Sequence, residues 1–236
     1  MVNLIYPGDS ISIPERTNVV TGPGIYLDPK SQHLKPINVG IEVIDPSKRV
    51  TSVYLDFNSK RYIPSEGDFV IGVITSTFAD SYRVSLANFS TAVTLSYMAF
   101  PNASKKNRPT LKVGDLLYAR VSKANKELEA EIECVDSSTG KDAGYGHLDG
   151  GVVVDVSLAF CRELLFNNDF PLLKLIGKRT EFEVAIGLNG KIWIKAADIL
   201  STLACYRIIL DCEKQPTSQY SEIIKNRFKE LANSAD

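Results

Sequence analysis

The apolar positions of the chain follow two different periods, and the change between them divides the chain. Up to residue 136, apolar residues form short alternating or continuous runs separated by Gly, Pro, Asn and Asp, which is typical of short β-strands. After residue 157, apolar residues also recur three and four positions apart, the spacing of amphipathic helices. The pattern predicts a β-rich N-terminal part and an α+β C-terminal part.

Residues 1–62 are predicted to form a small all-β domain. Turn-forming residues gather at 7–10, 22–24 and 45–47, and the runs 39–44 and 53–57 fit strands. No stretch has helical spacing. A module of this size is marginally stable alone, so we expect it to dock against something else.

Residues 63–136 are predicted to form a second all-β domain of five short strands. The third and fourth strands are separated by a long loop, which suits an OB-type barrel. In the last run, apolar residues from Leu128 to Cys134 alternate with glutamates from Glu127 to Glu133, so we expect one exposed acidic face. The predicted strands are 69–74, 82–86, 92–95, 116–121 and 128–134.

Residues 137–236 are predicted to form a third domain, which begins with a Gly/Ser-rich connector at 137–151. A strand at 152–156 is followed by a helix that Ser157 can cap and by a short helix at 171–176. A hairpin over 181–195 and helices near 197–213 and 218–232 follow. The apolar stripe expected on the first of these helices is Leu200, Leu203, Tyr206 and Leu210. The order β-α-α-β-β-α is that of a KH domain with an added C-terminal helix.

The hairpin contains the stretch Gly187-Leu188-Asn189-Gly190, which has two interpretations. A GxxG loop clamps a nucleic-acid backbone in KH domains, but there it lies between the first two helices. Here that junction is residues 167–170, without glycine, whereas the GxNG lies between two strands. Asn-Gly favours a type I′ turn, with positive φ at both residues. We interpret Gly187, Asn189 and Gly190 as a structural hairpin, with Trp193 on its opposite face as an interdomain anchor.

A basic cluster in the second domain is the main candidate for binding chemistry. Residues 105–126 hold seven basic side chains and one acid, Asp115. Basic loops beside an OB-type barrel can follow a nucleic-acid backbone, and Phe78, Tyr97 and Phe100 could offer stacking surfaces. The candidate RNA-binding residues are Tyr82, Arg83, Lys105, Lys106, Arg108, Lys112 and Lys123.

Composition narrows the classes of function. The net charge of −1 gives no global basic field, so nucleic acid must bind a local patch. Four cysteines are far apart in apolar stretches, which predicts buried thiols and no metal site. The chain has no P-loop, no Gly-x-Ser-x-Gly and no paired carboxylates in a catalytic context. There is no signal-peptide pattern, and no apolar run approaches the roughly 20 residues that span a bilayer. We expect no catalytic residues, no cofactor and no membrane association.

Four stretches carry a resemblance to a known family: residues 69–74, 96–109, 127–134 and 187–194. They resemble the RNA exosome cap subunits called ribosomal RNA-processing protein 40, over nearly the whole chain. The segment 105–109 is specific to that family, whereas the GxNG followed by Ile-Trp is shared with the sister cap subunit, ribosomal RNA-processing protein 4. The resemblance implies an N-terminal β domain, a ribosomal-protein-S1-type OB barrel and a KH domain.

The same resemblance implies a function. Such subunits are not enzymes; they stabilise a ring of RNase PH-like subunits, together with other cap subunits, and guide RNA into the pore for 3′–5′ processing and degradation. It implies a hetero-oligomeric complex acting in rRNA processing, RNA surveillance and mRNA turnover, in the nucleus, the nucleolus and the cytoplasm. Arg83 stands where strong S1-type binders have an aromatic residue, so we expect the isolated chain to bind single-stranded RNA weakly. The alternatives are the sister cap subunit and a stand-alone RNA-binding regulator.

Overall fold

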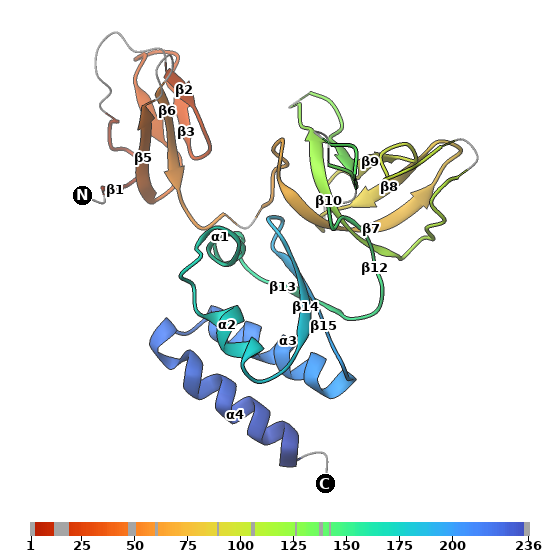
Figure 1. Ribbon diagram of the computed structural model, residues 1–236. Coiled ribbons are helices and arrows are strands. Elements are labelled where there is room, and N and C mark those ends of the chain that lie inside the picture. Colours follow the sequence, from red (N-terminus) through yellow and green to blue (C-terminus); the bar gives the residue numbers. More distant parts are fainter. Residues whose placement is uncertain are drawn as a thin grey trace. The chain divides into compact units, whose positions relative to one another are not determined.

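The computed structural model describes residues 3–11, 19–46, 51–59, 61–88, 90–104, 107–125, 127–136, 139–141 and 143–233. The chain divides into two units, Met1–Ser59 and Lys60–Asp236. The first contains strands, and the second contains a strand barrel followed by a sheet with helices (Figure 1). The predicted class, β-rich followed by α+β, is confirmed. The predicted boundary after residue 136 stays a prediction, because both domains that it separates lie within the second unit.

Within its described residues, the first unit has one four-stranded sheet and one two-stranded hairpin. The sheet has the order β1-β5-β6-β2, and β3 pairs with β4. In β6, buried residues alternate with less buried ones, so one face of the strand packs on the core. The bounds are β1 Leu4–Ile5, β2 Val19–Thr21, β3 Ile25–Leu27, β4 Leu34–Pro36, β5 Gly40–Pro46 and β6 Thr51–Asp56. The core consists of Ile5, Ile11, Ile25, Leu34, Val53 and Leu55.

The barrel begins the second unit, and its strands close on themselves. The sheet order is β11-β9-β8-β7-β10-β12, and β11 also pairs with β10, which closes five strands into an OB-type barrel. Strand β11 runs parallel to β9, and the other pairs are antiparallel. The bounds are β7 Phe69–Thr77, β8 Ser81–Ser85, β9 Val93–Ser96, β10 Leu116–Lys123, β11 Glu131–Glu133 and β12 Gly146–Leu148.

Two details of this region differ from the sequence pattern. The last barrel strand was expected to start at Leu128, but it starts at Glu131, and Leu128 is 71% exposed. The N–H of Leu128 bonds the carbonyl of Asn125 at 3.3 Å, so a turn interrupts the alternation. We expected a connector over 137–151, but Gly146–Leu148 form β12, which pairs with Leu116–Tyr118 and extends the barrel sheet.

The KH-type domain follows with a three-stranded sheet of order β13-β15-β14. Ser157 caps the first helix, since its hydroxyl accepts a bond from the N–H of Phe160 at 3.3 Å. Helix α3 contacts β13, β15 and α4 (Figure 1). The bounds are β13 Val152–Asp155, α1 Leu158–Phe166, α2 Leu172–Gly177, β14 Phe182–Gly187, β15 Lys191–Ala196, α3 Ile199–Glu213, the 3₁₀-helix η1 Thr217–Gln219 and α4 Tyr220–Asn233.

The packed side of α3 differs from the expected one. The sequence pattern suggested a stripe that includes Leu200 and Leu203, yet these side chains are 46% and 43% exposed. The helix is apolar on more than one side, so spacing alone does not select the side that meets the sheet. The buried side is formed by Ala204, Cys205, Ile208, Ile209 and Cys212.

Candidate nucleic-acid interface

Two loops of the barrel bring an aromatic and basic cluster together at its rim. Phe78, in the loop between β7 and β8, is 54% exposed. The hydroxyl of Tyr97 donates to the carbonyl of Phe78 at 2.7 Å. The guanidinium of Arg108 lies 5.7 Å from the centre of the Tyr97 ring and donates to the carbonyl of Ala79 at 2.9 Å. We name Phe78, Tyr97 and Arg108 the rim cluster.

The candidate Tyr82 belongs to the barrel core. Its side chain is 2% exposed, so it has no face to offer a nucleotide base in this conformation. Its hydroxyl donates to the carbonyl of Pro109 at 2.5 Å and accepts from the N–H of Leu111 at 3.3 Å. Burial raises the pKa of this phenol. The centres of the Tyr82 and Tyr97 rings lie 4.4 Å apart in an edge-to-face arrangement. Tyr82 therefore supports the rim cluster from the barrel core.

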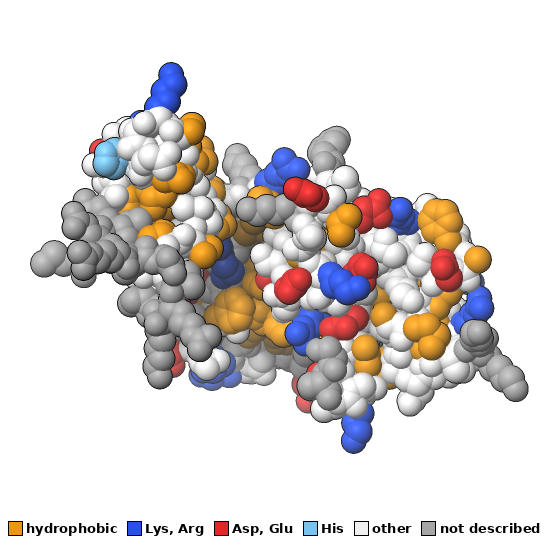
Figure 2. Space-filling view, turned by 90° about the horizontal axis from the view of Figure 1, so that it is seen from above, with side chains coloured by type: hydrophobic (Ala, Val, Ile, Leu, Met, Phe, Trp, Pro, Cys, Tyr) orange, Lys and Arg blue, Asp and Glu red, His pale blue; other side chains and the backbone are white. Residues whose placement is uncertain are grey.

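Two of the other candidate basic residues form ion pairs with glutamates. Arg83 forms an ion pair with Glu129, and Lys123 forms one with Glu131 at 2.9 Å. Two glutamates of the expected acidic face, Glu129 and Glu131, therefore pair within the same barrel. Figure 2 shows acidic and basic side chains interspersed on the face in view. This arrangement weakens the local attraction for phosphate.

The remaining candidates lie in the long loop before β10. Lys112 is exposed, and its backbone N–H bonds the carboxylate of Asp115 at 2.8 Å. Lys105 and Lys106 lie outside the described residues. Arg108, which follows them in the chain, belongs to the rim cluster and places a positive charge over the Tyr97 ring.

The GxNG loop is a hairpin, but its turn differs from the predicted one. Gly190 has φ of +79°, whereas Asn189 is not among the described residues with positive φ. The N–H of Gly190 bonds the carbonyl of Gly187 at 3.2 Å, and Gly187 pairs with Lys191. The prediction of a two-residue type I′ turn was therefore wrong. The loop has three residues, with the left-handed position taken by Gly190.

The Asn189 side chain joins this loop to the barrel. It is 6% exposed, and its Oδ1 accepts from the N–H of Ile71 at 3.1 Å. Its Nδ2 donates to the carbonyls of Ile71 at 2.8 Å and of Leu86 at 2.6 Å. The N–H of Leu188 bonds the carbonyl of Phe69 at 2.7 Å. The loop is thus fully engaged with β7 and is not open to a phosphate backbone.

Gly187 allows this close approach. A Cβ atom at this position would lie 2.3 Å from the Asn189 Oδ1 and 2.9 Å from the N–H nitrogen of Ile71. Any side chain would therefore displace Asn189 from the barrel strand. The GxNG motif therefore serves a contact between the two domains. The sequence analysis did not predict this contact, because no local pattern indicates which strand Asn189 binds.

Trp193 lies at the same domain boundary. It is 5% exposed and clusters with Ile71 of the barrel and Ala185 of β14. Its indole N–H donates to the carbonyl of Gly150 at 2.8 Å. Because the large indole ring is buried against Ile71 and its N–H is paired, Trp193 holds the hairpin against the barrel.

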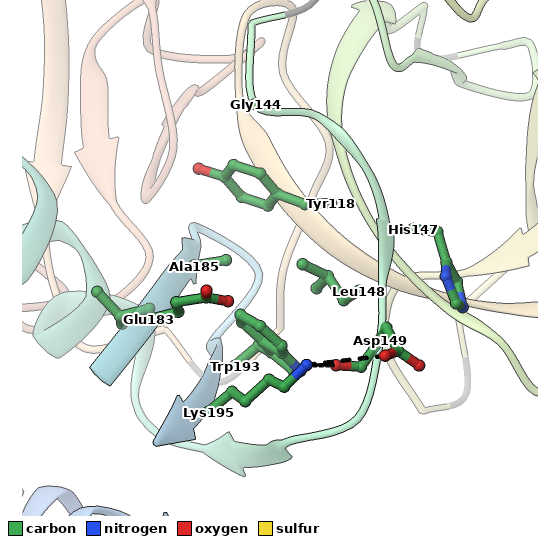
Figure 3. Close-up of a pocket in the computed structure, with 10 residues that line it drawn as sticks. Tyr118, Gly144, His147, Leu148, Asp149, Glu183, Ala185, Trp193 and Lys195 are labelled. Carbon is green, nitrogen blue, oxygen red and sulfur yellow. Dashed lines mark hydrogen bonds and ion pairs between the residues drawn. The ribbon is translucent and has the colours of Figure 1, made fainter. Parts of the chain in front are cut away.

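A pocket of about 390 Å³ opens beside this boundary (Figure 3). Tyr118, His147 and Leu148 of the barrel and Glu183, Trp193 and Lys195 of the KH-type domain line it. Lys195 donates to the carbonyl of Asp149 at 2.9 Å, and the Tyr118 hydroxyl donates to the carbonyl of Ile186 at 3.2 Å. Burial raises the pKa of Tyr118 to about 12. These groups serve the contact between the domains.

The cysteines and the possible metal ligands give no reactive centre in the part of the chain that is described. Cys134, Cys161, Cys205 and Cys212 are buried free thiols. Burial raises the pKa of Cys134 to about 12 and of Cys205 to about 11. Among the described residues, no group of three or more His, Cys, Asp or Glu side chains could hold a metal ion. No helix in those residues is long and apolar enough to cross a membrane.

The fold and the rim cluster define a class: multidomain RNA-binding proteins that join an S1-type barrel to a KH domain. Residues 62–146 match the model of the S1 domain of exosome complex component RRP40, and residues 151–200 match a KH-domain model. The exosome complex component RRP40 of Saccharomyces cerevisiae is 59% identical over 234 residues, 98% of each chain. The chain therefore belongs to the RRP40 family of exosome complex components.

More distant relatives agree with this assignment. The Schizosaccharomyces pombe rrp40 is 34% identical over 235 residues, covering 98% of this chain and 97% of that one. The human RRP40 is 37% identical over 182 residues, which are 77% of this chain and 64% of the human protein. A crystal structure described as an exosome complex RNA-binding protein shares the fold, with a TM-score of 0.60 and 23% identity over 75% of this chain and 99% of that one. The exosome complex component Rrp4 of Methanobrevibacter smithii is 23% identical over 168 residues, which are 71% of this chain and 54% of that one.

Proposed function

We propose that this chain is a non-catalytic cap subunit of the RNA exosome, which stabilises a ring of RNase PH-like subunits and guides single-stranded RNA toward its pore. The rim cluster on the S1-type barrel is the observation that carries the RNA-guiding part. Phe78 offers an exposed ring for stacking, and Arg108 places a cation over the ring of Tyr97, whose hydroxyl bonds the carbonyl of Phe78. Membership of the RRP40 family supports the place in the complex.

Weak binding by the chain alone fits the charges around the rim. Arg83 and Lys123 are paired with glutamates, so fewer cations are free to neutralise phosphates. The GxNG loop is bound to the barrel through Asn189. We infer that RNA follows the barrel rim and the basic loop, and that neighbouring subunits of the complex add to the affinity.

The proposal extends to the reaction that the complex performs. We propose that cleavage in 3′–5′ processing and degradation belongs to other subunits. The relatives' names as complex components and the S1 and KH domain matches over residues 62–146 and 151–200 support this. We propose roles in rRNA processing, RNA surveillance and mRNA turnover, in the nucleus, the nucleolus and the cytoplasm. RNase PH-like ring subunits and other cap subunits are the proposed partners.

Reconstitution tests this function. The other purified exosome subunits are assembled with and without the chain, and the mass of the complex and its affinity for a labelled single-stranded RNA are measured. We expect one copy of the chain per complex and tighter RNA binding when it is present. A chain that does not enter the complex, or that enters without changing RNA affinity, contradicts the proposal. The chain alone should leave labelled RNA intact with any divalent metal, and degradation that survives repurification would contradict the non-catalytic assignment.

A further inference from the structure

Helix α3 carries apolar side chains on a side that nothing in the described structure covers. Its inner side packs against the sheet and α4 through the buried residues named above. At its start, Ile199 is 79% exposed, Leu200 46% and Leu203 43%. A helix that is apolar all round is normally buried all round. Three neighbouring apolar side chains at one end of a helix are therefore typical of an interaction surface.

A groove of about 420 Å³ adjoins these side chains. It is lined by Gly151 and Val152, by residues 195–199, and by Thr202 and Leu203. The polar groups of the groove already bond within the domain. Asp198 accepts from the N–H of Ser201 at 2.7 Å, and the Thr202 hydroxyl donates to the carbonyl of Asp198 at 2.8 Å. The groove therefore favours an apolar occupant.

Charge indicates what kind of molecule fits. Ile199, Leu203 and Arg207 are spaced four residues apart and form one ridge of the helix, and Arg207 is exposed. The carboxylate of Asp198 lies at the other end of the ridge, where hydrogen bonds from Ser201 hold its pKa below the ordinary value. The Lys195 ammonium also lines the groove, but it donates to the carbonyl of Asp149 at 2.9 Å and lies 3.7 Å from the Asp149 carboxylate. The charge of Asp198, unneutralised among the described residues, disfavours a phosphate backbone. The surface suits a polypeptide with apolar residues followed by an acid.

We propose that this groove and the outer ridge of α3 bind a segment of another exosome subunit. The segment inserts apolar side chains beside Ile199 and Leu203 and places an acidic side chain against Arg207. This inference rests on the proposed function, because it requires the chain to be part of the complex.

The test uses the exosome assembled from its other purified subunits and the full-length chain. Affinity is measured for wild type, Leu203→Glu, Arg207→Glu and the control Phe166→Glu, whose side chain on α1 is 64% exposed. We expect Leu203→Glu to weaken binding at least tenfold, which is about 1.4 kcal/mol. Arg207→Glu should weaken it severalfold, and Phe166→Glu should stay within twofold of wild type. Circular dichroism melting checks that each variant folds.

A photo-crosslinking amino acid in place of Ile199, within the assembled complex, identifies the occupant. We expect a crosslink to another exosome subunit. A crosslink to RNA or to a second copy of this chain overturns the inference, as does equal binding by Leu203→Glu and wild type or an equal loss in Phe166→Glu. If wild type itself fails to join the complex, the proposed function is wrong. If wild type joins the complex and Leu203→Glu binds equally well, only the inference about α3 is wrong.

Discussion

The side-chain amide of Asn189 pairs with both backbone groups of Ile71, at 3.1 Å to the N–H nitrogen and 2.8 Å to the carbonyl oxygen. A side chain of the KH-type domain thus fills the hydrogen-bonding positions that a neighbouring strand would otherwise fill. The third bond goes to the carbonyl of Leu86, the residue that follows β8. At this point the KH-type domain is joined to backbone atoms of the barrel, and the packing of Trp193 on Ile71 and the bond from Tyr118 add side-chain contacts.

Asn189→Ala should destabilise the second unit strongly. The change leaves the N–H and carbonyl of Ile71 and the carbonyl of Leu86 unpaired in a buried place. An unsatisfied buried group costs about 1–3 kcal/mol, so we expect a loss of about 2–4 kcal/mol in the free energy of unfolding. Urea unfolding measures it, with Asn226→Ala on the exposed face of α4 as the control. If the two variants are equally stable, the Asn189 side chain does not hold the two domains together.

Gly190→Val should lower the melting temperature and leave RNA affinity per folded molecule nearly unchanged. Gly190 has φ of +79°, and a Cβ would lie 2.7 Å from the carbonyl oxygen of Val156. The left-handed conformation alone costs a non-glycine residue roughly 1–2 kcal/mol. Melting temperature and RNA affinity are measured on the same preparation. A variant that melts normally but no longer binds RNA would show that the loop is a phosphate clamp.

The triple variant Lys105→Ala/Lys106→Ala/Arg108→Ala should weaken RNA binding by the assembled complex and flatten its dependence on salt. Each lost phosphate contact to a single strand reduces the slope of log K against log salt by about 0.7, so three contacts give about 2. The measurement is a series of binding curves at increasing salt. An unchanged slope assigns RNA guidance to another surface.

Phe78→Ala should weaken RNA binding without changing that slope. The ring is exposed at the rim, and stacking of one base on an aromatic ring is worth about 1–3 kcal/mol. Leu128→Ala, an exposed apolar residue of the same barrel, is the matched control. If both variants bind like wild type, Phe78 is not a stacking surface.

The buried thiols should make the protein less stable at alkaline pH. Burial raises the pKa of Cys134 and Cys161 from 9.0 to about 12. The unfolded chain loses these protons near pH 9 while the folded chain keeps them, so stability falls as the pH rises from about 9 toward 12. Denaturant midpoints at increasing pH measure the effect, and Cys134→Ala should reduce its steepness. Below pH 8, a thiol reagent should label the cysteines only after unfolding.

The elements could be predicted where the signals are local. Ser157 precedes α1 and caps it, and Asn167 ends it, as the sequence indicates. The turn type at Asn189 and Gly190 was wrong, because Asn189 uses its side chain for the barrel and its backbone has no need of positive φ. Its partner Ile71 lies 118 residues away, a distance that no local pattern reports. The side of α3 that packs against the sheet could not be predicted either, because apolar residues lie on both the packed and the exposed sides of the helix.

Mapping RNA–protein crosslinks in the assembled complex tests the central claim most directly. Single-stranded RNA with photoreactive bases is bound to the complex, and the crosslinked residues of this chain are identified by mass spectrometry. We predict crosslinks at the rim cluster, between residues 78 and 112, and none at residues 187–190. Crosslinks concentrated at 187–190, with none on the barrel rim, would contradict the account.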